Sequence, residues 1–153
     1  MEYLNSLRRH VGHAPLLMVG AAVLLVNEQG RLLLLKRSDS GRWGPPGGAV
    51  EPGEEVESAA RREVWEETGL ELGALRLFGV FSGAELFYRY PNGDEVHNVS
   101  IIYLGSEIHG EVRLNGELTE WRWFTPGDIP EELSPPIKPV MRAFLEGLDK
   151  DTA

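Results

Sequence analysis

Three glutamates, Glu63, Glu66 and Glu67, fall within the nine residues "REVWEETGL" (62–70). Carboxylates grouped this closely can exchange protons with a substrate or share one divalent cation. Mg²⁺ and Mn²⁺ prefer oxygen ligands, and two carboxylates one helical turn apart can reach the same ion. Which of these reactions the segment can support therefore depends on whether the carboxylates point into the protein or into solvent.

The segment around these glutamates, residues 55–68, has the composition of a helix. Helical periodicity places Glu63 and Glu67 on one face with Val56 and Ala60, so the face that should be buried is half acidic. Burying unpaired carboxylates costs free energy, so something must neutralise them. Three alternatives are open: a solvated face with Glu–Arg pairs, protonated carboxyls, or a bound hard cation.

A loop rich in glycine and proline, "GPPGGAVEPGE" (44–54), precedes this helix. Gly47 and Gly48 have no side chain, so their backbone can approach a ligand and their carbonyl oxygens can join a metal shell. Glu54 stands within reach of the positive end of the helix or of Arg62, which we expect to be buried among carboxylates. Together these features suggest an oxygen-lined metal site for phosphate chemistry.

The spacing from Gly48 to Leu70 resembles the Nudix box, G-x5-E-x7-R-E-U-x-E-E-x-G-U, where U is a bulky aliphatic residue. Every fixed position of that pattern is present over these 23 residues. The segment Trp-Gly-Pro-Pro-Gly-Gly at 43–48 and the Trp-Phe pair after Glu120 also resemble the corresponding segments of Nudix hydrolases. The resemblance covers roughly residues 16–147 of the chain.

Nudix hydrolases use a divalent metal to cleave a diphosphate linkage in a nucleoside diphosphate attached to another group. The resemblance implies that Glu63 and Glu67 are the principal metal ligands, for Mg²⁺ or Mn²⁺. It implies that Glu66 is a further ligand or orients the attacking water, and that the Gly47 carbonyl is a backbone ligand. Arg62 would pair with the carboxylates of the box and hold them in place.

Several members of the family carry another catalytic or metal-binding glutamate six residues before the tryptophan of the Trp-Phe strand. Glu117 has this spacing from Trp123, and Glu120, three residues before it, is the alternative. Either glutamate could instead be a solvated loop charge. Lys36 and Arg37, at the end of a strand, could contact phosphate or could simply be solvated.

The remaining pattern predicts the elements that must position these residues. We expect helices and strands in this order: a helix at 2–10, strands at 18–26 and 31–37, a loop at 38–54, the acidic helix, strands within 74–83 and 84–105 with a turn at 91–94, a strand from 120, and a helix within 134–148. Strands outnumber helices. We therefore predict an α/β fold, a Nudix-like α/β/α sandwich with a mixed β-sheet, as a single domain of residues 1–153 with a helical extension at 1–13.

Composition restricts the partners of this chain. Its 153 residues carry a net charge of −9 and contain no cysteine. The acidic balance argues against binding nucleic acid, and a polyanionic substrate would require cations recruited locally. The apolar run at 14–26 imitates a signal peptide, but a strand followed by a polar turn at 27–30 explains it better. We expect a cytoplasmic protein that does not bind membranes.

These observations lead to a metal-dependent pyrophosphohydrolase acting on a nucleoside triphosphate, nucleotide sugar or dinucleoside polyphosphate. A catalytically silent nucleotide sensor and an RNA 5′-pyrophosphohydrolase are the alternatives, and the isomerases of this fold are set aside because they use a cysteine. The apolar stripe within residues 2–13 must be buried on its own domain or on a second copy, and we favour a homodimer. We expect this segment to be dispensable for chemistry.

Overall fold

The structure, a computed structural model, describes the backbone of residues 1–152 and the side chains of residues 1–148, so the predicted end of the domain at 153 lies outside the described residues. Its helices are α1 (Glu2–Val11), α2 (Val56–Thr68) and α3 (Lys138–Thr152), with short 3₁₀ helices η1 (Ala84–Leu86), η2 (Pro126–Asp128) and η3 (Pro135–Ile137). All three predicted α-helices are therefore confirmed.

The strands are β1 (Leu16–Leu25), β2 (Leu32–Arg37), β3 (Trp43–Gly44), β4 (Gly47–Ala49), β5 (Glu71–Leu72), β6 (Leu75–Phe81), β7 (Phe87–Arg89), β8 (Glu95–Gly105), β9 (Ile108–His109) and β10 (Leu118–Phe124). The larger sheet has the order β4–β1–β8–β6, with β7 beside β8. Strands β1 and β8 run parallel, whereas the other pairs are antiparallel. The predicted mixed sheet is confirmed, and a second sheet follows the order β10–β2–β3.

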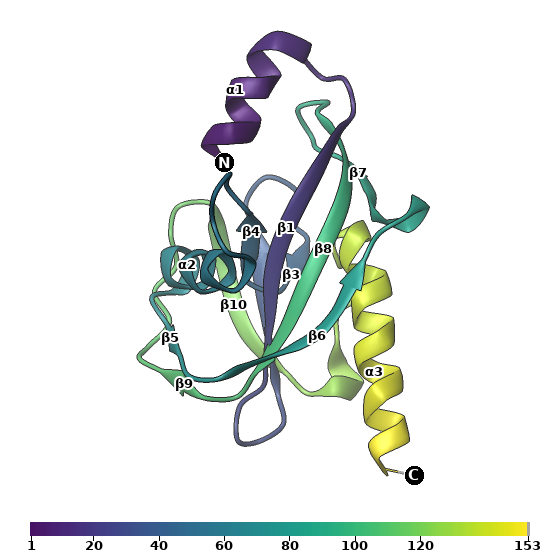
Figure 1. Ribbon diagram of the computed structural model, residues 1–153. Coiled ribbons are helices and arrows are strands. Elements are labelled where there is room, and N and C mark those ends of the chain that lie inside the picture. The colour runs from purple at the N-terminus through teal and green to yellow at the C-terminus, as the bar shows by residue number, and fades with distance from the viewer. Residues whose placement is uncertain (153) are drawn as a thin grey trace.

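Helices cover both sides of these sheets, with α2 and α3 on opposite sides in Figure 1. The run of leucines in β2 shows how one strand serves both layers. Leu33 and Leu35 belong to the core beneath α2, and Leu32 and Leu34 belong to the core beneath α3. Successive side chains of a strand point to opposite faces, so a continuous apolar run can be buried on both of them. The α/β/α arrangement is therefore confirmed.

The loop predicted at 38–54 is more ordered than expected, because it contains the short strands β3 and β4. Strand β4 pairs with β1 through Gly47 opposite Ala22 and Gly48 opposite Ala21. A Cβ at Gly47 would lie closer than 3.0 Å to the backbone of Ala21 and Ala22. Only glycine permits this close approach, which places the glycine pair on the sheet in front of α2.

The turn expected at 91–94 joins β7 to β8, and Gly93 has a φ of 95°. The segment that imitates a signal peptide forms strand β1. No helix within residues 1–152 combines the length and the hydropathy needed to cross a bilayer.

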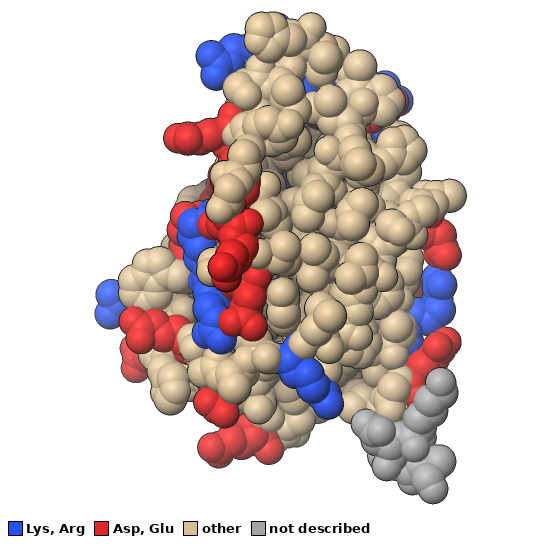
Figure 2. All heavy atoms as spheres, in the orientation of Figure 1, with Lys and Arg blue, Asp and Glu red and all other residues tan. Residues whose placement is uncertain are grey.

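Charged side chains are unevenly distributed over the face shown in Figure 2, where they gather along α2 and leave the centre of the larger sheet uncharged. Exposed apolar side chains on this sheet include Leu17 and Val19 of β1 and Leu77 and Val80 of β6. An uncharged sheet face is compatible with contact to a second copy. The homodimer expected from the sequence stays a prediction.

Candidate active site

Helix α2 carries the glutamates on the face predicted from its periodicity. Glu63 is 9% exposed and Glu67 is 7% exposed, and Ala60 on the same face is fully buried. Glu66 lies at the edge of this face, with 51% of its side chain exposed. The helix ends where Gly69 adopts a φ of 74° and its N–H donates to a carbonyl one turn back. The solvated-face alternative is therefore wrong for Glu63 and Glu67.

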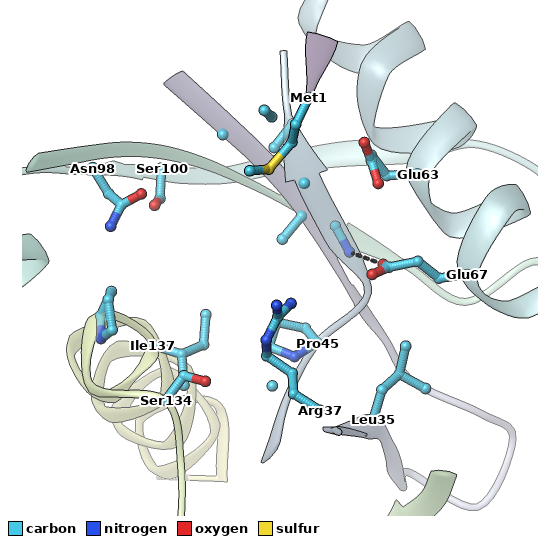
Figure 3. A pocket seen from close by; sticks show the side chains of 18 of the residues that line it. Met1, Leu35, Arg37, Pro45, Glu63, Glu67, Asn98, Ser100, Ser134 and Ile137 are labelled. Carbon is cyan, nitrogen blue, oxygen red and sulfur yellow. Dashed lines mark hydrogen bonds between the residues drawn. The ribbon is translucent and has the colours of Figure 1, made fainter. Parts of the chain in front are cut away.

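The glycine pair of β4 forms a floor beneath these two carboxylates. The N–H of Gly47 donates a 2.7 Å hydrogen bond to Glu67 Oε1, which is the dashed line in Figure 3. A Cβ at Gly48 would lie closer than 3.0 Å to the carboxyl group of Glu63. The missing side chains thus make room for the carboxylates themselves. The predicted role of the Gly47 carbonyl as a metal ligand stays a prediction.

Arg62 organises the carboxylates around it, as the resemblance implied. Its Nε and Nη2 donate to the two oxygens of Glu54 at 2.6 and 2.9 Å, and its Nη1 donates to Glu63 at 2.9 Å and to Glu66 at 3.3 Å. Nη2 also donates to the carbonyl of Ala49. Hydrogen bonding from this guanidinium lowers the pKa of Glu54 to about 2. The expectation of a buried arginine is wrong in degree, because 30% of the Arg62 side chain is exposed.

Burial raises the pKa of Glu67 to about 8. The Gly47 N–H and the positive charge of Arg37 oppose this rise, whereas the negative charges of Glu63 and Glu117 add to it. Burial likewise raises the pKa of Glu63, although the hydrogen bond and charge of the neighbouring arginine offset part of the rise. Burial therefore disfavours the charged form of both principal candidate ligands, and a bound cation would neutralise that charge.

A cavity of about 550 Å³ opens in front of α2 and β4. All four predicted catalytic or metal-binding glutamates line it: Glu63, Glu66, Glu67 and Glu117. Glu120 is not among the lining residues in the described part of the chain. It lies opposite Lys36 in the pairing of β10 with β2. Geometry therefore favours Glu117 over Glu120 as the glutamate outside the box.

The two basic candidates differ in position. Arg37 lines the cavity but donates two hydrogen bonds to Asp39, at 3.0 and 2.9 Å. Lys36 is not among the residues found along the cavity wall, and its Nζ lies 5.9 Å from the ring centre of Trp43. Arg37 is therefore the better candidate for contact with phosphate.

Several lining residues were not predicted as site residues. Asn98 and Ser100 of β8 reach the cavity, and the buried Asn98 donates a 2.9 Å hydrogen bond to the Leu86 carbonyl. Tyr88 and Tyr90 also line it, with ring centres 4.8 Å apart. Strand alternation offered a signal for the β8 pair, because two polar residues share a face with buried aliphatic ones.

The donor set fits a hard cation. Glu67 is buried, and no cationic side chain among the described residues forms an ion pair with its carboxylate, so only the Gly47 N–H and the more distant charge of Arg37 oppose the cost of its burial. Carboxylate oxygens are the ligands that Mg²⁺ and Mn²⁺ prefer. Residues 1–148 contain no group of three acidic, histidine or cysteine side chains already converged as a metal site. Glu66, which turns toward Arg62, would have to reorient to share an ion with the buried pair.

Replacing Arg62 by alanine should lower the free energy of unfolding by about 2 kcal/mol, between the values typical of exposed and fully buried ion pairs. The reason is that Glu54 and Glu63 would lose their shared partner. Arg76→Ala, an exposed position on β6, removes the same charge and serves as the control. Chemical denaturation of both variants measures the difference, and equal midpoints would refute an organising role for Arg62.

The stability of the metal-free protein should fall as the pH rises from about 5 to 8. The pKa of Glu67 is raised from 4.5 to about 8 in the folded state, so the folded protein holds this proton more tightly than the unfolded chain does. The contribution of Glu67 to the free energy of unfolding is therefore complete below pH 4.5 and is lost as the pH rises through 8. Thermal melting in EDTA measures this slope. Glu67→Gln should flatten it, whereas Glu71→Gln, exposed on β5, should leave it unchanged. An unaltered slope in Glu67→Gln would show that Glu67 does not titrate in this range.

Comparisons with known proteins agree with this geometry. Residues 16–145 match the NUDIX domain family. The chain is 36% identical over 129 residues to a Bacillus subtilis (strain 168) protein whose name provisionally assigns it 8-oxo-dGTP diphosphatase activity; the match covers 84% of this chain and 80% of that protein. It is 34% identical over 110 residues to the ADP-ribose pyrophosphatase of Methanocaldococcus jannaschii, covering 70% of this chain and 62% of that one.

A solved structure supports the same conclusion. The crystal structure of a MutT NUDIX hydrolase from Burkholderia pseudomallei superimposes with a TM-score of 0.70 at 33% identity. The superposition covers 86% of this chain and 97% of that one. With the family match spanning most of the chain, this protein belongs to the NUDIX domain family of hydrolases.

Proposed function

We propose that this protein is a metal-dependent hydrolase that cleaves the diphosphate linkage of a nucleoside diphosphate attached to another group. As a Nudix hydrolase, it acts on pyrophosphate bonds. The observation that carries the finer proposal is the pair of buried carboxylates, Glu63 and Glu67, packed over the Gly47–Gly48 floor of a cavity. The presence of every box glutamate supports turnover over silent binding.

Glu63 and Glu67 would hold Mg²⁺ or Mn²⁺, with Glu66 and the Gly47 carbonyl as further ligands. When bound, the metal supplies the positive charge that neutralises the oxygens of the diphosphate. This chain has a net charge of −9, so its cavity needs such a cation before a polyanion can enter.

The side chains around the metal ligands have separate tasks in this proposal. Arg62 orients the Glu63 carboxylate and restricts its motion through a 2.9 Å hydrogen bond. A carboxylate oxygen of Glu117 accepts the proton of the attacking water, because this residue lines the cavity outside the paired cluster. Arg37, which also lines the cavity, contacts a terminal phosphate oxygen.

The group attached to the nucleoside diphosphate is best sought among substrates that the relatives suggest. Their names point to 8-oxo-dGTP and to ADP-ribose, and a cavity of about 550 Å³ suits one nucleotide. The test is a panel of dGTP, 8-oxo-dGTP, ADP-ribose and diadenosine tetraphosphate with Mg²⁺ or Mn²⁺, followed by detection of phosphate, pyrophosphate and nucleotide products. Tight binding of a nucleotide without turnover of any would refute the enzymatic proposal in favour of a sensor.

Activity should require divalent metal, and Glu63→Gln or Glu67→Gln should reduce kcat by at least about 100-fold, because an amide oxygen is a much weaker ligand than a carboxylate. Circular dichroism should show that both variants remain folded. Glu71→Gln is the matched control and should retain wild-type kcat. Full turnover by the double glutamine variant would exclude the metal site.

Glu117→Gln should lower kcat by about 100-fold with little change in KM, as expected for loss of a proton acceptor. Glu120→Gln removes an equal charge three residues away, outside the cavity, and should have little effect. Steady-state kinetics on the best panel substrate distinguishes the two. A raised KM at constant kcat in Glu117→Gln would instead assign this residue to substrate binding.

A further inference from the structure

Helix α1 lies outside the region matched by the NUDIX domain family, yet it reaches the cavity that holds the catalytic candidates. Met1 and Asn5 line this cavity together with Glu63 and Glu67. Figure 3 shows the Met1 side chain between Ser100 and Glu63, on the side of the cavity away from η3. The helix is therefore part of the cavity wall, although the sequence led us to expect a segment remote from chemistry.

The N-terminal end of α1 is fastened to the loop that precedes α2. This helix has no side-chain cap of its own, and its first N–H groups would otherwise lack partners. The Tyr3 N–H donates to Glu51 Oε2 at 3.2 Å, and the nitrogen of Met1 lies 2.9 Å from Glu51 Oε1. The Glu51 N–H in turn donates to Glu54, whose carboxylate accepts hydrogen bonds from Arg62. Glu51 thus joins α1 to the catalytic network.

The other end of α1 is fastened to the turn between β7 and β8. Arg8, with only 13% of its side chain exposed, donates to the Glu95 carbonyl at 2.6 Å and lies 3.6 Å from Asp94. His13, just after the helix, lies 2.7 Å from Asp94. Between the two ends, Leu4 is 6% exposed. A helix held at both ends and packed on its inner face is a fixed wall.

We propose that α1 determines which substrates this hydrolase accepts, with Asn5 and Met1 as specificity-determining residues that admit one nucleoside with its phosphates and exclude a second nucleoside. The inference rests on the proposed function. One anchor of α1 lies beside the acidic helix, and the other lies on the hairpin that carries Tyr88 and Tyr90. The helix is therefore tied both to the loop before the acidic helix and to the aromatic hairpin, and its Met1 and Asn5 take up part of the cavity that a second nucleoside would need.

The first test compares kcat/KM for dGTP and for diadenosine tetraphosphate in the full-length protein. Arg8→Ala and deletion of residues 1–11 should raise the ratio in favour of the dinucleotide at least tenfold, because the wall is released. Arg9→Ala removes the same charge from the next position of α1, which is exposed, and should keep the wild-type ratio. Unchanged ratios in both altered proteins would overturn the proposal. Wild-type protein inactive on the whole panel would instead refute the proposed function.

The second test does not depend on turnover. The chain contains no cysteine, so Asn5→Cys and Arg9→Cys each introduce a single thiol. With Ca²⁺ present, dGTP should slow maleimide labelling of the Asn5→Cys protein at least threefold and leave the Arg9→Cys protein unaffected. Equal labelling rates with and without dGTP in Asn5→Cys, under conditions where dGTP binding is detected by calorimetry, would show that α1 does not face the substrate.

Discussion

Burial of two carboxylates against a glycine floor is the constraint on which the rest of this structure depends. Glu63 and Glu67 are withdrawn from water without full compensation by the protein, and burial raises the pKa of both. Such an arrangement costs stability in the metal-free protein and is useful only if something else neutralises the charge. Gly47 and Gly48 are part of the same constraint, because any side chain there would displace the carboxylates or the neighbouring strand.

The surrounding framework holds this costly arrangement in place. Strand β4 is paired with β1, and the apolar side of α2 is buried on the core beneath it. Arg62 links Glu54, which precedes α2, to Glu63 within this helix. The site is therefore built on a strand and a helix rather than on a free loop, which limits its motion before a metal or substrate arrives. In the proposed function, this strand and helix position the metal ligands, and the rest of the cavity wall contacts the substrate.

The periphery is where this chain acquires features of its own. Helix α1 lies outside the family match, whereas β1, β8 and η3, which also line the cavity, lie within it. Nudix relatives with similar sequences carry names with different substrates, which indicates that the shared box does not determine the attached group. The polar pair Asn98 and Ser100 and the two tyrosines of the hairpin offer the contacts that could distinguish one base or sugar from another.

The sequence by itself determined the three α-helices, the long strands and the acidic face of α2, because helical periodicity and the Nudix box are local patterns that do not depend on distant contacts. It missed the short strands β3, β4, β5 and β9, which exist only through their pairing partners. It could not show that β1 and β2, adjacent along the chain, join different sheets, nor that β1 pairs in parallel with β8. It also could not separate Glu117 from Glu120, or bring Asn5 to the cavity. Those outcomes depend on pairing between residues far apart in the chain, which only the folded core decides.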